Sequence, residues 1–137
     1  MEIVVIDGQG GGIGKAIVDR LRRTCNEELE IIALGTNSLA TSMMLKAGAN
    51  EGATGENAIV YNSTRVDMIL GSVGIVCANS FLGELTPKMA EAIAESSVKK
   101  VLIPLNKCNV LVVGIENKSL PHYIEDVVEI VKNYGGR

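Results

Sequence analysis

The opening fifteen residues, MEIVVIDGQGGGIGK, constrain the fold of this 137-residue chain more strongly than any other segment. An apolar run over residues 3–6 ends at Asp7, five of the next seven residues are glycine, and a helical pattern follows at once. This order predicts a strand, a tight turn and a helix whose first amide groups face the turn. Because glycine permits positive φ angles and close approach of a ligand to the backbone, the segment predicts a phosphate-binding loop over Gly8–Gly14.

The composition is that of a globular domain, which we expect to span residues 1–137. Apolar residues make up 47% of the chain, enough for a full core. The net charge is −3 and the Lys and Arg residues are scattered, which argues against nucleic acid as a partner. No apolar run approaches the roughly 18 residues that cross a membrane, and Glu2 stands where a signal peptide carries positive charge.

The cysteine pattern predicts a reduced, cytoplasmic protein without a metal site. Cys25, Cys77 and Cys108 form no C-x-x-C pair, and His122 is the single histidine. Cys77 is expected to be a small core residue, and His122 a surface residue in the first turn of the last helix.

Strands and helices are expected to alternate along the chain. We predict strands at residues 2–6, 30–34, 49–53, 100–104 and 110–115, with one more at either 66–70 or 73–78. Helices are predicted at residues 12–24, 38–48 (with Ser38 as the cap), 55–64 (capped by Thr54), from Thr86-Pro87 onward, and at 120–133. The alternation predicts a single Rossmann-like three-layer α/β/α domain with a mostly parallel sheet.

The last two predicted strands are separated only by residues 105–109. A parallel crossover needs about a dozen residues or more, so we expect residues 100–104 and 110–115 to form a hairpin. The sheet would then have one antiparallel edge strand.

The spacing of the glycines distinguishes between phosphate-loop motifs. The ATPase P-loop pattern fails because Gln9 occupies its first glycine position and Ala16 replaces the hydroxyl residue that binds Mg²⁺. The G-x-G-x-x-G fingerprint fails because Ile13 stands at its third glycine. The pattern G-x-x-x-G-x-G fits at Gly8, Gly12 and Gly14.

With this pattern the first 25 or so residues resemble the head of the short-chain dehydrogenase/reductase family. The resemblance implies that Gly8–Gly14 holds the pyrophosphate of NAD or NADP. The chain departs from the family in lacking its Tyr-x-x-x-Lys pair, since Arg65 follows Tyr61 at that spacing and Val127 follows Tyr123. It also lacks the acidic residue that holds the adenosine ribose, because Gly35-Thr36-Asn37-Ser38 follows the second strand.

The chain as a whole resembles a small uncharacterised bacterial family of Rossmann-like proteins, for which no activity is implied. The likeness is carried by residues 8–15, 54–58, 82–87 and 103–109, which read GQGGGIGK, TGENA, LGELTP and IPLNKCN.

The loops that follow parallel strands meet at one edge of the sheet, and ligands of such folds bind there. Thr36 and Asn37 offer hydrogen bonds to a ribose or a 2′-phosphate, and Asn79 ends a further strand candidate. The cofactor-binding residues predicted on this basis are Gly8, Gln9, Gly10, Gly11, Gly12, Ile13, Gly14, Thr36, Asn37 and Asn79.

The turn before residue 110 is open to two interpretations. Asn106 or Asn109 in a left-handed conformation would make it a purely structural turn. Alternatively, Asn106, Lys107 and Cys108 bind a substrate or second ligand, with Lys107 contacting a phosphate or carboxylate and lowering the pKa of the Cys108 thiol.

The sequence favours a small domain that binds a nucleotide or dinucleotide, NAD or NADP in the first place, as a sensor or accessory subunit. The alternatives are a minimal reductase or thiol-dependent enzyme that uses Lys107 and Cys108, and an assembly module without a ligand. No catalytic set is evident. A homodimer is expected in each case because the short chain has an apolar balance, with a mean hydropathy of +0.25, and an apolar edge strand.

Overall fold

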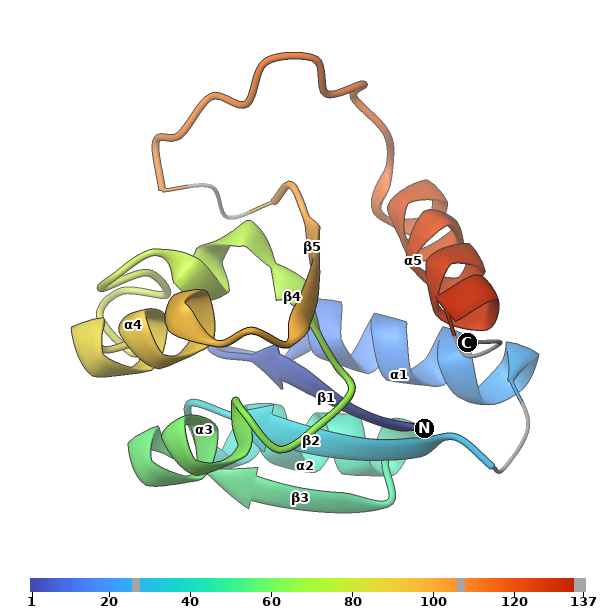
Figure 1. The fold of residues 1–137 in the computed structure, drawn as a ribbon, viewed down its shortest axis with the longest axis horizontal. Coiled ribbons are helices and arrows are strands. Elements are labelled where there is room, and N and C mark those ends of the chain that lie inside the picture. Colours follow the sequence, from blue (N-terminus) through green and yellow to red (C-terminus); the bar gives the residue numbers. More distant parts are fainter. Residues whose placement is uncertain (26–27, 106–107, 135–137) are drawn as a thin grey trace.

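The computed structural model describes residues 1–25, 28–105 and 108–134, and its centre is a five-stranded parallel sheet (Figure 1). The strands lie in the order β3-β2-β1-β4-β5. Their bounds are β1 Glu2–Asp7, β2 Glu30–Gly35, β3 Glu51–Thr54, β4 Met68–Ser72 and β5 Lys99–Ile103. The predicted α/β class with a Rossmann-like three-layer arrangement is confirmed.

Helices cover both faces of the sheet. Those in the described part are α1 Gly12–Thr24, α2 Ser38–Ala47, α3 Glu56–Asn62, α4 Pro87–Glu95 and α5 Leu120–Tyr134, with a short 3-10 turn η1 at Val73–Val76. Helices α1, α2 and α5 contribute to the core on one face, while α3, α4 and η1 contribute to the core on the other. Within the described ranges, no helix has the combination of length and apolar character that crossing a membrane requires.

The burial of β1 explains why its sequence is continuously apolar. Ile3 and Val5 belong to the core under α1 and α5, and Val4 and Ile6 belong to the core under α3 and α4. All four side chains are at most 1% exposed. Because both faces of this central strand are covered, its side chains are apolar on both faces. The alternation of apolar and polar residues that is typical of a half-exposed strand is therefore absent.

The middle of the chain settles the choice between the two strand candidates. The strand is β4, Met68–Ser72, and the chain then leaves the sheet in η1. Gly71 allows β1 to approach closely, since a Cβ there would lie 2.9 Å from the carbonyl oxygen of Ile6. Two predicted caps were displaced by one residue: Asn37 caps α2 in place of Ser38, and Gly55 precedes α3 in place of Thr54.

The prediction of an antiparallel edge strand at residues 110–115 was wrong. In the described part of the chain all strand pairs are parallel, and β5 pairs with β4 alone. Cys108 and Asn109 both have positive φ angles, 52° and 62°, and residues 108–119 leave the sheet as an arch at the top of Figure 1. An apolar run predicts a strand only where a partner edge and a covering layer are both in reach, and here Leu111 and Val113 are 87% and 93% exposed instead.

Candidate functional site

The candidate site lies at the carboxyl edge of the sheet, at the point between β1 and β4 where the strand order reverses. From β1 the chain proceeds through β2 to β3 on one side, and then crosses to β4 and β5 on the other. The loops after β1, β2 and β4 therefore meet there, as expected for the ligand crevice of an open α/β sheet.

The glycine loop turns directly into helix α1. Gln9 and Gly11 have φ angles of 50° and 75°, and the amide of Gly11 donates to the carbonyl of Gly8 at 3.0 Å. Gly11 is the N-cap residue of α1, and its carbonyl accepts from Lys15 at 2.8 Å. The first turn of α1 itself contains no acidic residue, and the carboxylate at this positive helix end is that of Asp7, which precedes the loop.

Asp7 organises this loop from within the protein. One carboxylate oxygen accepts from the amide of Gly8 at 2.8 Å, and the other from the amide of Gly14 at 2.6 Å. The side chain is buried, and burial raises the pKa of Asp7 above 3.8, while the backbone hydrogen bonds from Gly14, Gly8 and Ile13 oppose the shift. Sequence reasoning treated Asp7 only as the end of the strand, although its position directly before the glycines is the signal for this role.

Glu84 joins the three loops of the site. It comes from the connection between η1 and α4, and its Oε1 atom accepts from the amide of Gln9 at 2.8 Å. The same atom accepts from the Thr36 hydroxyl at 2.7 Å and from the Asn37 side-chain amide at 2.8 Å. The Thr36 hydrogen bond, followed by those of Gln9 and Asn37, lowers the pKa of Glu84, so the side chain is an anion at neutral pH.

A phosphate-binding loop needs backbone amides that have no acceptor within the protein, and only part of this loop provides them. The amides of Gly8, Gln9, Gly11 and Gly14 donate within the protein, as does that of Ile13 toward Asp7. Among the described residues, no hydrogen-bond acceptor is recorded for the amides of Gly10 and Gly12.

Gly10 and Gly12 also differ from the other glycines in their surroundings. A Cβ at Gly8 would lie 2.6 Å from Thr36 Oγ1, and one at Gly14 would lie 2.9 Å from the Cβ of Asp7, so packing requires both glycines. At Gly10 and Gly12 no atom lies within 4 Å of a built Cβ, and both residues are exposed. Neither has a positive φ angle. Packing within the protein therefore does not explain these two glycines.

The remaining predicted site residues are divided between the edge and the undescribed part. Asn79 has a φ angle of 69°, and its amide donates to the carbonyl of Leu85 at 2.7 Å, which makes it a turn residue of the η1–α4 connection. Asn106 and Lys107 lie outside the described residues. Cys108 does reach the edge: with Gln9 and three residues of the η1–α4 connection it lines a hollow of about 240 Å³.

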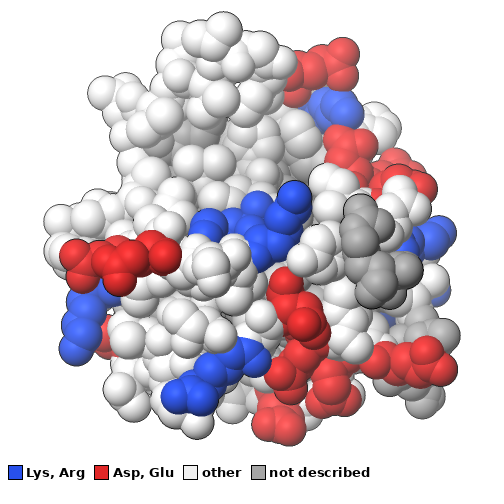
Figure 2. Space-filling view, in the orientation of Figure 1, with Lys and Arg blue, Asp and Glu red and all other residues white. Residues whose placement is uncertain are grey.

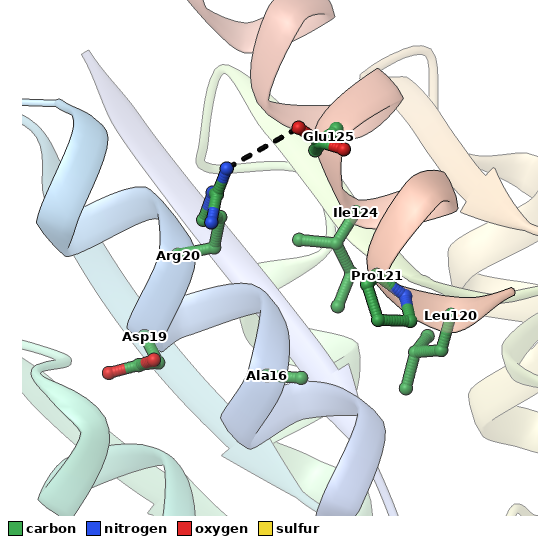
Figure 3. A pocket seen from close by; sticks show the side chains of 7 residues that line it. All are labelled: Ala16, Asp19, Arg20, Leu120, Pro121, Ile124 and Glu125. Carbon is green, nitrogen blue, oxygen red and sulfur yellow. Dashed lines mark hydrogen bonds and ion pairs between the residues drawn. The ribbon is translucent and has the colours of Figure 1, made fainter.

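A separate hollow of about 360 Å³ lies between α1 and α5 (Figure 3). Its lining side chains are Ala16, Asp19, Arg20, Leu120, Pro121, Ile124 and Glu125. Arg20 reaches across to Glu125 at 3.4 Å, and Asp19 pairs with Arg23 at 3.3 Å. Because these charges are already paired, the hollow offers a ligand fewer polar groups to bind than the glycine loop does.

The fold and the loop together define a Rossmann-like α/β domain with a glycine-rich turn at its carboxyl edge. The chain belongs to a family described as a domain of unknown function, DUF3842, whose model matches residues 2–135. No curated protein matches the chain.

A solved structure shares the fold. It is a dodecameric FMN-dependent UbiX-like decarboxylase from Escherichia coli O157:H7, with a TM-score of 0.51 and 15% sequence identity. The similarity covers 98% of this chain and 95% of the decarboxylase chain, and at this identity it concerns the fold alone. The likeness of the opening segment to short-chain dehydrogenases/reductases stays a sequence-based expectation.

Proposed function

We propose that residues 1–137 form a single cytoplasmic domain that binds a nucleotide or dinucleotide through Gly8–Gly14, as a sensor or accessory subunit. The observation that carries this proposal is the open space over Gly10 and Gly12. Both residues are exposed at the start of α1, and packing does not account for either of them. Backbone amides at a helix N-terminus form a favourable site for a phosphate, and glycine lets the phosphate approach them.

Glu84 gives the proposed site a second contact. Its Oε1 atom is held by Gln9, Thr36 and Asn37, whereas no hydrogen bond to Oε2 is recorded among the described residues. This carboxylate lies at the end of β2, where dinucleotide-binding folds place an acidic residue that accepts from the ribose hydroxyls. The sequence pattern does not identify Glu84, because the pattern expects the acidic residue directly after β2 and Glu84 comes from the η1–α4 connection. A fixed negative charge there favours a free ribose over a ribose 2′-phosphate, and hence NAD over NADP.

The role of sensor or accessory subunit is proposed because the sequence lacks the proton-donating residues of the reductases. The Tyr-x-x-x-Lys pair that donates a proton in the reductases is missing from the sequence. The structural neighbour is FMN-dependent, so a flavin mononucleotide is a necessary comparison ligand in the test.

We expect calorimetry to show NAD binding, with NADP at least about tenfold weaker because its 2′-phosphate meets the Glu84 carboxylate. The panel also contains FMN and AMP. Gly12→Ala should weaken NAD binding at least about tenfold, because the new Cβ occupies the path of the phosphate, and should leave the melting temperature within about 2 °C. Glu84→Gln should bring the NAD and NADP affinities together.

The control for Glu84→Gln is Glu91→Gln on the exposed side of α4, which should change neither affinity. Failure of every nucleotide to bind at millimolar concentration would contradict the proposal. Binding that Gly12→Ala leaves intact would place the ligand somewhere other than the glycine loop.

We also propose that the protein is a homodimer that buries residues 110–115. These residues carry several of the most exposed apolar side chains. The arch that contains them lies at the top of Figure 1, and the top of the molecule in Figure 2 is uncharged, with charged side chains only at its right. Exposed apolar patches of this kind mark protein interaction sites.

Light scattering at micromolar concentration should give the mass of a dimer for the natural chain and of a monomer for the double variant Leu111→Lys/Val113→Lys. Leu82→Lys is the matched control, since Leu82 is 95% exposed but lies in the η1–α4 connection. A monomeric mass for the natural chain would refute the homodimer.

A further inference from the structure

Two of the three cysteines meet at the carboxyl edge of the sheet. Cys77 ends the η1 turn, where its thiol donates to the carbonyl of Val73 at 3.5 Å. Cys108 stands at the base of the arch formed by residues 108–119, far from Cys77 in sequence. Cys108 nevertheless lines the same hollow as Ser80, and the amide of Ser80 donates to the carbonyl of Cys77 at 3.2 Å, so the two cysteines belong to adjoining segments. The neighbouring Cys108 thiol contributes to raising the pKa of Cys77.

The surroundings of the two sulfurs differ. Cys108 is exposed and faces the hollow beside Gln9, so a small molecule can reach its sulfur. Cys77 is half-buried, and burial together with the neighbouring Cys108 thiol raises its pKa. Because Cys108 is the exposed sulfur, it is the thiol that reacts first with a reagent from solution, and the half-buried Cys77 is the thiol that resolves the product.

We propose that Cys77 and Cys108 form a dithiol–disulfide couple that is oxidised by small-molecule disulfides. The Cys108 thiolate attacks one sulfur of the disulfide RSSR, the S–S bond breaks, and one RS⁻ leaves and takes up the proton that Cys108 gave up. The Cys77 thiol then loses its proton and attacks the Cys108 sulfur, which expels the second RS⁻ as RSH. In sum, two protein thiols and RSSR give one protein disulfide and two RSH.

The third cysteine has a different place in the fold. Cys25 is the C-cap residue of α1, where its amide donates to the carbonyl of Leu21. It packs against the core at the end of α1 that lies away from the glycine loop. Cys25 therefore serves as an internal control, because a reaction common to all cysteines of this chain would also modify Cys25.

The new bond would tie the base of the arch to the η1–α4 connection next to Gln9. Both segments contribute to the hollow of about 240 Å³, so oxidation would fix two of its walls relative to each other. The couple depends only on the two thiols and is independent of whether a nucleotide binds to the glycine loop.

The experiment treats the reduced protein with oxidised glutathione and measures the intact mass and the cysteine-containing peptides. The natural chain should lose about 2 Da and give a peptide pair joined through Cys77 and Cys108. Cys77→Ser should instead accumulate glutathione on Cys108, with release of the second glutathione slowed at least about tenfold. Cys25→Ser should behave as the natural chain does.

Two outcomes would overturn the proposal. One is accumulation of the Cys108–glutathione adduct in the natural chain to the same level as in Cys77→Ser. The other is a disulfide that contains Cys25 or joins two copies of the chain. The peptide map of the natural chain decides the question on its own, so a folding defect in a variant does not obscure the result.

Discussion

Replacing Asp7 with alanine is expected to lower the free energy of unfolding by about 2–4 kcal/mol at neutral pH. The substitution leaves the amides of Gly8 and Gly14 without their acceptor, and both of these residues are buried. Each buried donor left unpaired costs about 1–3 kcal/mol, and removal of a buried carboxylate offsets part of the sum. Urea unfolding followed by circular dichroism measures the difference.

A matched control for this substitution is Asp67→Ala. The Asp67 carboxylate also accepts from a backbone amide, that of Glu2 at 2.8 Å, but on the exposed surface. Water replaces it there, so the expected loss is within about 0.5 kcal/mol. Equal losses in the two variants would show that burial of the Asp7 hydrogen bonds is not what stabilises the loop.

The Asp7 variant also has a predictable pH dependence. Burial raises the pKa of Asp7 in the folded state above its ordinary value of 3.8, so protonation of this group favours folding. The stabilising contribution is fully present below pH 3.8 and is lost as the pH rises through the folded-state pKa. The deficit of Asp7→Ala relative to the natural chain should therefore be larger near pH 4 than at neutral pH, and the reverse trend would contradict the raised pKa.

Gly35→Ala is expected to destabilise the protein by about 3 kcal/mol or more. A Cβ at Gly35 would meet the Thr41 hydroxyl, and would lie 2.6 Å from both the Thr41 amide nitrogen and the Asn37 carbonyl oxygen. Two of these three atoms belong to the backbone at the start of α2, so the helix itself must move. Thermal unfolding should show a decrease in melting temperature of roughly 10 °C.

The control for Gly35→Ala is Gly10→Ala, where no atom lies within 4 Å of the added carbon. We expect this variant to melt within about 2 °C of the natural chain. A large loss at Gly10 would mean that the loop needs this glycine for folding, and the case for a ligand at this position would then fail. The two variants thus distinguish a glycine that packing within the protein requires from a glycine that leaves open space for a ligand.

Much of the fold was predictable from the sequence because its signals are local. The apolar run of β1, the helical stripe of α1 and the Thr86-Pro87 start of α4 each depend on residues a few positions apart. Helix α1 was predicted at residues 12–24 and is found at Gly12–Thr24. Antiparallel pairing of residues 110–115 was the main error, because neither the covering of a sheet edge nor the turn at Cys108 and Asn109 is encoded in an apolar run.

The sequence alone determined the glycine loop, the alternation of strands and helices and the missing Tyr-x-x-x-Lys pair, since each follows from residue type and spacing. Contacts between distant segments were decided only by the tertiary structure. Glu84 meets Gln9 and Thr36, and Cys108 lies beside the connection that follows Cys77, because parallel strands bring the loops that follow them to one edge. The same packing decides which loop amides turn inward to Asp7 and which remain open, and no local pattern of glycines carries that information.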